Sequence, residues 1–237
     1  MKANLDSTQE SAPSPVTPPD FSHLAKIYRW MELFSFGPWL ERCRTAFLLD
    51  ISACRSALVL GDGDGRFTAQ LLRKNPFIHV DAVDASPAML SELLRRAGTD
   101  STRVDVHPAD ARTLNFPGSQ YDLIATHFFL DCLTDQEFVA LAMRLRFCVA
   151  PGALWVVSEF AVPPNLFGKF VARPLIAALY RIFGAMTGLK IRSIPNYPAI
   201  LLQNGFVLTL KRSLLAGLLV SELWSATPSS AETVAGR

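Results

Sequence analysis

The sequence predicts an α/β protein built on a doubly wound, mostly parallel sheet. Apolar runs of strand length alternate with segments of helical periodicity between residues 57 and 160, which is the spacing of such sheets. A glycine-rich turn, GDGDG at 61–65, follows the first apolar run, and Asp84 ends the second. Open α/β sheets bind ligands in the crevice beyond the carboxyl ends of their strands. The turn and the acid therefore predict a nucleoside-binding crevice.

Periodicity and turn residues predict the order of the elements along the chain. The strands are expected over 57–60, 79–84, 103–107, 121–127 and 153–160, and the helices over 66–74, 87–97 and 135–148. Two further strands, near 206–211 and 218–224, are expected to close the sheet as an antiparallel edge pair.

Several of these boundaries carry local signals. Ser86 can cap the helix that follows it, and Pro87 stands at the first helical position, where a missing N–H is tolerated. Thr134 and Glu137 have the spacing of a capping box. Pro151-Gly152 is expected to end the third helix and to turn the chain into the fifth strand.

The length of 237 residues fits one well-filled domain, expected over 21–224. The segments 1–20 and 225–237 are rich in small and polar residues, and both are predicted to be disordered tails. Residues 21–49 are apolar and aromatic, with a break at Gly37-Pro38, which predicts a cap of two short helices before the first strand.

Composition excludes several classes of protein. Half of the residues are hydrophobic, and the net charge of +2, without any basic run of five, gives no case for nucleic acid binding. No zinc motif, disulfide framework or other metal-ligand cluster is visible. The sequence has no signal-peptide pattern and no apolar stretch of membrane-spanning length, so the expected location is the cytoplasm. The cysteines are widely spaced and expected to be reduced: Cys43, Cys54, Cys132 and Cys148.

The glycine turn favours a cofactor without phosphate. The dinucleotide fingerprint needs glycine at its first, third and sixth positions, and neither a start at Gly61 nor one at Gly63 meets that pattern. Asp62 and Asp64 would repel a pyrophosphate. S-adenosylmethionine has no phosphate and carries a sulfonium and an ammonium, so an acidic turn suits it better than it suits a nicotinamide dinucleotide.

Asp84, nineteen residues after Gly65, is placed to accept hydrogen bonds from two ribose hydroxyls. Taken alone, the glycines have an alternative interpretation as a tight strand-to-helix turn without a ligand. The acid at this distance favours the nucleoside.

With these motifs the chain resembles the class I S-adenosylmethionine-dependent methyltransferases over about residues 28–224. GDGDG is similar to the glycine motif of that family and Asp84 to its ribose acid, while YDLIATHFF and LRFCVAPGALWVVSEF match its fourth and fifth strands. The motif PADARTLNF implies that Asp110 meets the adenine amino group and Ala111 the adenine ring. The resemblance implies a Rossmann-like methyltransferase fold of seven strands with an N-terminal helical cap.

One position departs from the family. The family usually has an acid two residues before the first glycine, where this chain has Val59, and Asp62 is predicted to meet the methionine ammonium instead. Tyr28, in the cap, could donate a hydrogen bond to the cofactor, and Met89 could pack on the adenine; core packing is the alternative for both. The predicted cofactor-binding residues are Tyr28, Gly61, Asp62, Gly63, Gly65, Asp84, Ala85, Met89, Asp110, Ala111 and His127.

His127 and Asp131 follow the fourth strand and are the candidate catalytic residues. Methyl transfer is an in-line displacement that needs alignment and, for a protonated acceptor, a base. His127 could be that base or could pack beside the cofactor, and Asp131 could orient an acceptor hydroxyl or cap a loop. Glu159 ends a strand at the same edge and is a further candidate. The favoured alternative is that Glu159 is a buried acid bonded to loop amides.

The segment 166–191 is apolar with scattered basic residues. It could contact a membrane surface peripherally or line a lipophilic pocket, and an amphipathic helix packed on the sheet is the alternative. The cap sequence AKIYRWMELFSFGPWLERCR and the segments PLIAALYRIFGAMTGL and LLQNGFVL resemble the ubiquinone/menaquinone C-methyltransferase-like group. That resemblance implies a small aromatic or lipophilic methyl acceptor.

Three hypotheses therefore stand in order of preference. The first is an S-adenosylmethionine-dependent methyltransferase acting on a small molecule. The second is a non-catalytic cofactor-binding or scaffold protein of the same fold, and the third is a nicotinamide-dependent reductase. The acceptor atom (C, O or N) and the oligomeric state stay open.

Overall fold

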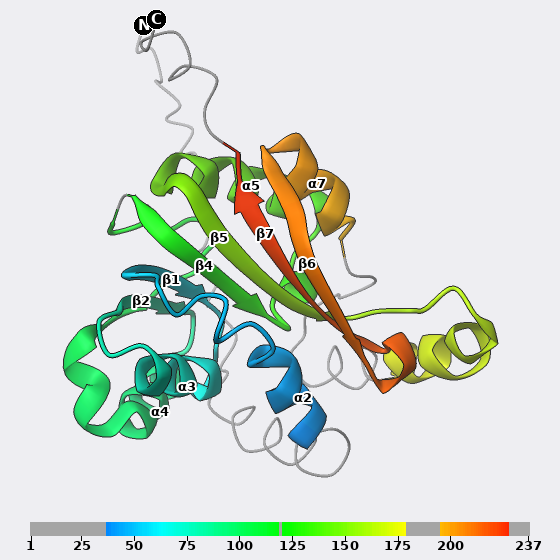
Figure 1. Ribbon diagram of the computed structural model, residues 1–237, viewed down its shortest axis with the longest axis horizontal. Coiled ribbons are helices and arrows are strands. Elements are labelled where there is room, and N and C mark those ends of the chain that lie inside the picture. The colour runs from blue at the N-terminus through cyan, green and yellow to red at the C-terminus, as the bar shows by residue number, and fades with distance from the viewer. Residues whose placement is uncertain (1–36, 119, 179–194, 228–237) are drawn as a thin grey trace, which may run out of the picture.

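The computed structural model describes residues 37–118, 120–178 and 195–227 (Figure 1). Its strands form one seven-stranded sheet in the order β3-β2-β1-β4-β5-β7-β6. β5 pairs with β7 and β7 with β6 in antiparallel fashion, and all other neighbours are parallel, which confirms the predicted fold class. The strands are β1 (Ser56–Leu60), β2 (His79–Asp84), β3 (Val104–Pro108), β4 (Tyr121–His127), β5 (Val149–Phe160), β6 (Phe206–Leu214) and β7 (Leu219–Ala226).

The strand order reverses at β1, which lies between β2 and β4. From β3 the chain returns across the sheet and adds β4 on the far side of β1. The carboxyl ends of β1 and β4 therefore meet at a topological switch point, where open α/β sheets bind their ligands.

The helices cover both faces of the sheet (Figure 1). They are α2 (Gly37–Arg44), α3 (Arg66–Lys74), α4 (Pro87–Ala97), α5 (Asp135–Cys148) and α7 (Tyr197–Gln203), with short helices η1 (Gly98–Arg103), η2 (Leu130–Cys132) and η4 (Leu215–Gly217) and a π-helical turn η3 (Gly168–Ala172). Leu58 and Leu60 of β1 pack in the core that contains α5 and α7, whereas Ala57 and Val59 pack in the core that contains α3 and α4. Because a parallel strand is covered on both faces, β1 is apolar at every position after Ser56.

Most predicted boundaries agree with the structure, and β2, β4, α3, α4 and α5 have the predicted bounds. β5 differs, because it begins at Val149 rather than at residue 153. Pro151-Gly152 lies inside the strand, at a register shift against Tyr121 and Leu123 of β4, with Gly152 at a φ of 74°. The dipeptide therefore forms an irregularity within the strand instead of a turn before it.

The ends of the domain also differ from the prediction in part. Gly37-Pro38 begins α2, because proline is well suited to the first turn of a helix. β7 extends to Ala226, so residues 225 and 226 are ordered in the sheet and were wrongly assigned to a disordered tail. The predicted tail 1–20, the cap before residue 37 and residues 228–237 lie outside the described residues.

The long helix expected from residue 166 is helical over 166–178, with the π-helical turn η3 near its start. Residues 179–191 of this segment lie outside the described residues. Among the helices that the structure describes, none is long and apolar enough to cross a membrane.

Candidate functional site

The glycine turn lies between β1 and α3 and has the backbone that only glycine adopts easily. Gly61, Gly63 and Gly65 have φ angles of 68°, 59° and 79°. A Cβ on Gly65 would lie 2.5 Å from Leu93 Cγ and 2.8 Å from Leu93 Cα, so α4 could not pack so close to any other residue. A Cβ on Gly61 would lie 2.4 Å from the ring of Phe129. The turn thus packs against α4 and against the loop after β4.

Asp84 and the glycine turn lie together, as predicted. Asp84 Oδ2 accepts a hydrogen bond from Gly63 N at 3.3 Å, and Oδ1 accepts one from Ser86 N at 2.8 Å. Burial raises the pKa of Asp84, and the two amides partly offset that effect. Each carboxylate oxygen has a second lone pair, so Asp84 keeps acceptor capacity for ribose hydroxyls.

Asp62 caps α3. Its Oδ1 accepts from Phe67 N at 3.2 Å and its Oδ2 from Thr68 N at 2.8 Å. Burial raises the pKa of Asp62 to about 6, against the opposing effects of these amides and of Arg44. Because Asp62 occupies the amides of Phe67 and Thr68, these two amides are not available to a phosphate. A contact between Asp62 and a methionine ammonium stays a prediction.

The missing family acid has an apolar substitute in this chain. Val59 is buried in the core that contains α3 and α4. The side chain at this position therefore contributes to packing.

Asp110 and Ala111 follow β3 at the same edge of the sheet. Ala111 is buried, and Ala109 N donates to Asp84 O at 3.1 Å, which places this segment beside Asp84. Arg112 Nη2 lies 2.6 Å from Asp110 Oδ2, and this hydrogen-bonded guanidinium lowers the pKa of Asp110. Arg112 also bonds Glu137 of α5. Arg112 was not predicted as a site residue, although its position within the motif PADARTLNF was the available signal.

His127 ends β4 and is buried. Its Nδ1 lies 2.9 Å from Ser158 Oγ, and its ring lies 4.2 Å from that of Phe67. Burial, and secondly Arg44, lower the pKa of His127 well below the ordinary value, so the ring is neutral near pH 7. Nε2 has no hydrogen-bond partner among the described residues.

Ser158 connects His127 to α2. Its Oγ donates to Cys43 O at 3.2 Å and lies 2.9 Å from Ser221 Oγ. With its proton on Cys43 O, Ser158 accepts the Nδ1 proton of His127, and this arrangement leaves Nε2 as an acceptor. Neither serine was predicted, since nothing in the sequence relates two serines 63 residues apart.

Glu159 holds the loop after β4. Its Oε1 accepts from Phe129 N at 3.1 Å and from Leu130 N at 2.9 Å, so the favoured alternative, an acid bonded to loop amides, describes its contacts. Burial, and secondly Asp131, raise the pKa of Glu159 well above the ordinary value. Phe128, at the start of this loop, has a φ of 53°, a strained value for a residue with a side chain.

The remaining predicted residues have different positions. Asp131 lies in η2, near Glu159, and accepts a hydrogen bond from Cys132 Sγ at 3.5 Å. Met89 Sδ is 4.0 Å from where a Cβ of Gly63 would be, so Met89 lies beside the turn, and Ala85 is exposed next to Asp84. Tyr28 lies outside the described residues.

Within the described ranges no three His, Cys, Asp or Glu side chains are grouped to hold a metal. The site instead presents Asp84 and the glycine backbone, and Asp62 already occupies the amides of α3. This donor set fits a nucleoside that carries positive charge and no phosphate.

Known proteins agree with this assignment. Residues 57–152 match the family described as a methyltransferase domain. Polyamine aminopropyltransferase 2 of Bacillus cereus is 37% identical over 84 residues, which cover 31% of this chain and 23% of that protein.

Solved structures share the fold. An O-methyltransferase family protein from Burkholderia thailandensis superposes with a TM-score of 0.66 at 16% identity, over 89% of this chain and 62% of that one. The S-adenosylmethionine-dependent methyltransferase SibL gives a TM-score of 0.63 at 21% identity, over 91% and 64% of the two chains. The N,N-8-amino-8-demethyl-D-riboflavin dimethyltransferase RosA of Streptomyces davawensis gives a TM-score of 0.61 at 18% identity, over 88% and 62% of the two chains.

The chain thus spans about three fifths of the length of these solved structures. At such identities the likeness concerns the fold, while the family match concerns residues 57–152. Residues 57–152 therefore match a methyltransferase domain, and the chain has the fold of solved methyltransferases.

Proposed function

We propose that this protein transfers a methyl group from S-adenosylmethionine to a small aromatic or lipophilic molecule. The observation that carries the proposal is the pairing of Asp84 with the glycine turn while Asp62 occupies the amides at the start of α3. A ribose acceptor is available there, and two of the amides that a phosphate would use are occupied by Asp62.

In this mechanism the cofactor supplies an activated methyl group, and the chain supplies alignment and a water-poor site. Asp84 holds the ribose through its remaining lone pairs, and Met89 flanks the nucleoside beside Gly63. Glu159 fixes the loop after β4, and with it the position of Asp131. The acceptor is held against this loop.

We assign the orientation of a protonated acceptor to Asp131 rather than to His127. His127 is neutral and its lowered pKa makes it a weak base, so its role is to accept a hydrogen bond at Nε2 and to pack beside the cofactor. Asp131→Asn is then expected to lower turnover about a hundredfold with unchanged cofactor affinity. If His127→Gln abolishes turnover and removes a limb of the pH profile instead, the base is His127.

The acceptor class rests on the resemblance of the chain ends to the ubiquinone/menaquinone C-methyltransferase-like group. Proteins of the same fold are named as O-methyltransferases and as dimethyltransferases of an amino compound, so the fold is compatible with several acceptor atoms. The cytoplasm is the location that we propose, since all four cysteines are free and burial raises the pKa of Cys43 and Cys54 to about 12, as expected of inert thiols.

Calorimetry with S-adenosylhomocysteine tests the cofactor site first. The wild-type chain is expected to bind it, and Asp84→Ala is expected to weaken binding at least about tenfold, because charged hydrogen bonds to the ribose are lost. Asp105→Ala is the matched control: this carboxylate begins β3 at the opposite edge of the sheet, 2.9 Å from His79. Equal losses in both variants, or tight binding of NADPH by the wild type, would contradict the proposal.

A radiolabelled-cofactor assay over phenols and quinols then tests the reaction. Label is expected in an aromatic or lipophilic acceptor. The competing function is a cofactor-binding scaffold, which the apolar Val59 favours. Binding of S-adenosylhomocysteine without turnover on any acceptor of a broad panel would decide for that alternative.

A further inference from the structure

The charges of the chain are strongly segregated. Between Glu159 and Glu222 the sequence contains no Asp or Glu. The same stretch contains seven basic residues: Lys169, Arg173, Arg181, Lys190, Arg192, Lys211 and Arg212. Since the whole chain carries a net charge of only +2, the remainder is acidic. Any partner that recognises this stretch by charge must therefore be anionic.

The first part of this stretch forms a firmly placed helical segment. After β5 the chain turns at Pro163 and becomes helical over 166–178, at the end of the sheet beside the turn between β6 and β7 (Figure 1). Ala172 and Ile176 are buried against Leu218 and Phe160. A Cβ on Gly168 would lie 1.7 Å from Pro163 O, so the segment lies directly on the backbone that leads into it.

The opposite side of this segment is both apolar and basic. Leu166 is 74% exposed, Phe170 67% and Val171 47%. Lys169 and Arg173 lie one helical turn apart among these side chains, and Lys169 Nζ is 5.5 Å from the ring of Phe170. Neither cation forms an ion pair with any residue that the structure describes, whereas Lys211 and Arg212 pair with Glu222 and Asp50.

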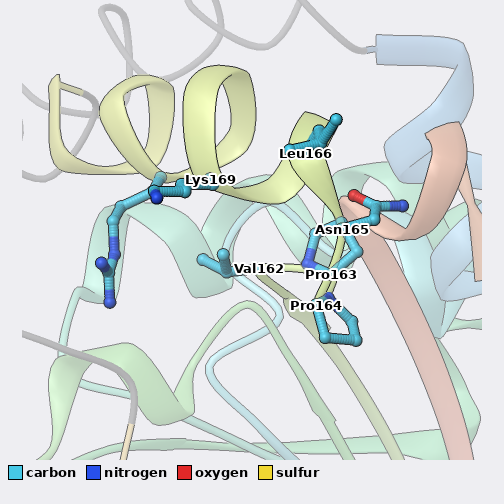
Figure 2. A pocket seen from close by; sticks show the side chains of 7 residues that line it. Val162, Pro163, Pro164, Asn165, Leu166 and Lys169 are labelled. Carbon is cyan, nitrogen blue, oxygen red and sulfur yellow. The ribbon is translucent and has the colours of Figure 1, made fainter.

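Below this side lies an open hollow of about 470 Å³. Figure 2 shows it between the helical segment that carries Leu166 and Lys169 and the strand exit that carries Val162 and the two prolines. Its lining is mainly apolar, and Lys169 and Arg173 are its charged members. An anion attached to an apolar chain satisfies both kinds of surface at once, and an isolated phosphate does not.

We propose that this surface, formed by Val162, Pro163, Pro164, Leu166, Lys169, Phe170, Val171 and Arg173, docks the protein on a bilayer that contains anionic lipids. Lys169 and Arg173 meet lipid phosphates, while Leu166 and Phe170 enter the headgroup boundary. The segment continues from Glu159 and Phe160 at the carboxyl end of β5, the same edge of the sheet as the glycine turn. Docking would turn the cofactor edge toward the membrane, but the proposal does not depend on methyl transfer.

Sedimentation of the full chain with phosphatidylcholine vesicles, with and without 30% phosphatidylglycerol, tests this proposal. Binding is expected only with the anionic lipid and is expected to weaken between about 50 and 300 mM salt. The double variant K169E/R173E is expected to lose about 30-fold or more in affinity, at about fivefold for each cation. R73E/K74E, two exposed cations of α3, is the charge-matched control and should bind like the wild type.

The apolar contribution is tested by L166S/F170S, which is expected to bind about tenfold more weakly or worse. Its control is M143S/F147S on α5, where the two side chains are 52% and 83% exposed. Equal binding to neutral vesicles, equal losses in the controls, or no sedimentation with any vesicle would overturn the proposal. So would a wild-type dimer in solution that L166S/F170S dissociates, because a second copy would then cover this surface.

Discussion

The residues from β1 to β5 and the residues after β5 differ in how their charged side chains are bound. In the first region, acids at the carboxyl ends of strands are bound to backbone amides or to arginine: Asp62, Asp84, Asp110 and Glu159. In the second, no acid occurs before Glu222, and Lys169 and Arg173 lie among exposed apolar side chains.

The two regions therefore differ in whether their charged side chains are bound within the molecule or face solvent. The first region binds its acids at the carboxyl ends of the strands within the molecule and thereby fixes the geometry of the glycine turn and of the loop after β4. In the second, Lys169 and Arg173 form no ion pair with a described residue and lie among exposed apolar side chains, as expected of a surface that meets something outside the molecule. Substitutions in the two regions should therefore affect different measurements.

The largest effect is expected at Gly65 in the first region. Alanine there must adopt a φ of 79° and place its Cβ 2.8 Å from the Leu93 backbone. We expect Gly65→Ala to lower the free energy of unfolding by about 3 kcal/mol or more, measured by urea denaturation. Gly152→Ala shares the positive φ, 74°, but meets nothing within 4 Å, and should lose about 1–2 kcal/mol. Equal losses would show that packing against α4 is unimportant.

The second effect concerns pH and Asp62. The folded-state pKa of Asp62 is about 6, against 3.8 for the free side chain, so the protonated form favours folding. Stability from this group is present below pH 4 and is lost as the pH rises from about 4 to 6, by about 3 kcal/mol. Asp62→Asn should remove that loss, as seen in denaturation curves across this range. A variant with the same pH slope as the wild type would contradict the assignment.

The smallest effect on the free energy of unfolding is expected in the second region. Leu166→Ser and Phe170→Ser change exposed side chains, so each should alter the free energy of unfolding by no more than about 0.5 kcal/mol. The same variants are expected to weaken vesicle binding. A stability loss of several kcal/mol would mean that these side chains belong to the core of the protein, and the contrast between the two regions would fail.

Local signals explain why most of the first region could be predicted. Ser86 accepts from Met89 N, and Thr134 and Glu137 form the full capping box, so the starts of α4 and α5 are decided by neighbouring residues. The start of β5 is decided by pairing with Tyr121, 28 residues earlier, and for that reason the local Pro-Gly signal was misleading.

The contacts of the candidate site can also be divided into those that have a local sequence signal and those that have none. Gly63 and Asp84 were predicted to lie together because one βαβ unit contains both. The links of His127 to Ser158 and of Ser158 to Cys43 join residues 31 and 115 positions apart, and such contacts have no local signature. The helix-capping role of Asp62 depends on its rotamer, which the spacing of glycines does not reveal.

The position of Asp62 has a consequence for cofactor exchange. The Asp62 carboxylate accepts hydrogen bonds from two amides that would otherwise be free to bind the diphosphate of a dinucleotide cofactor. Because it belongs to the same chain, this carboxylate competes with such a ligand at a high effective concentration. Redesign toward a dinucleotide would therefore have to begin by removing that side chain, before any glycine is moved.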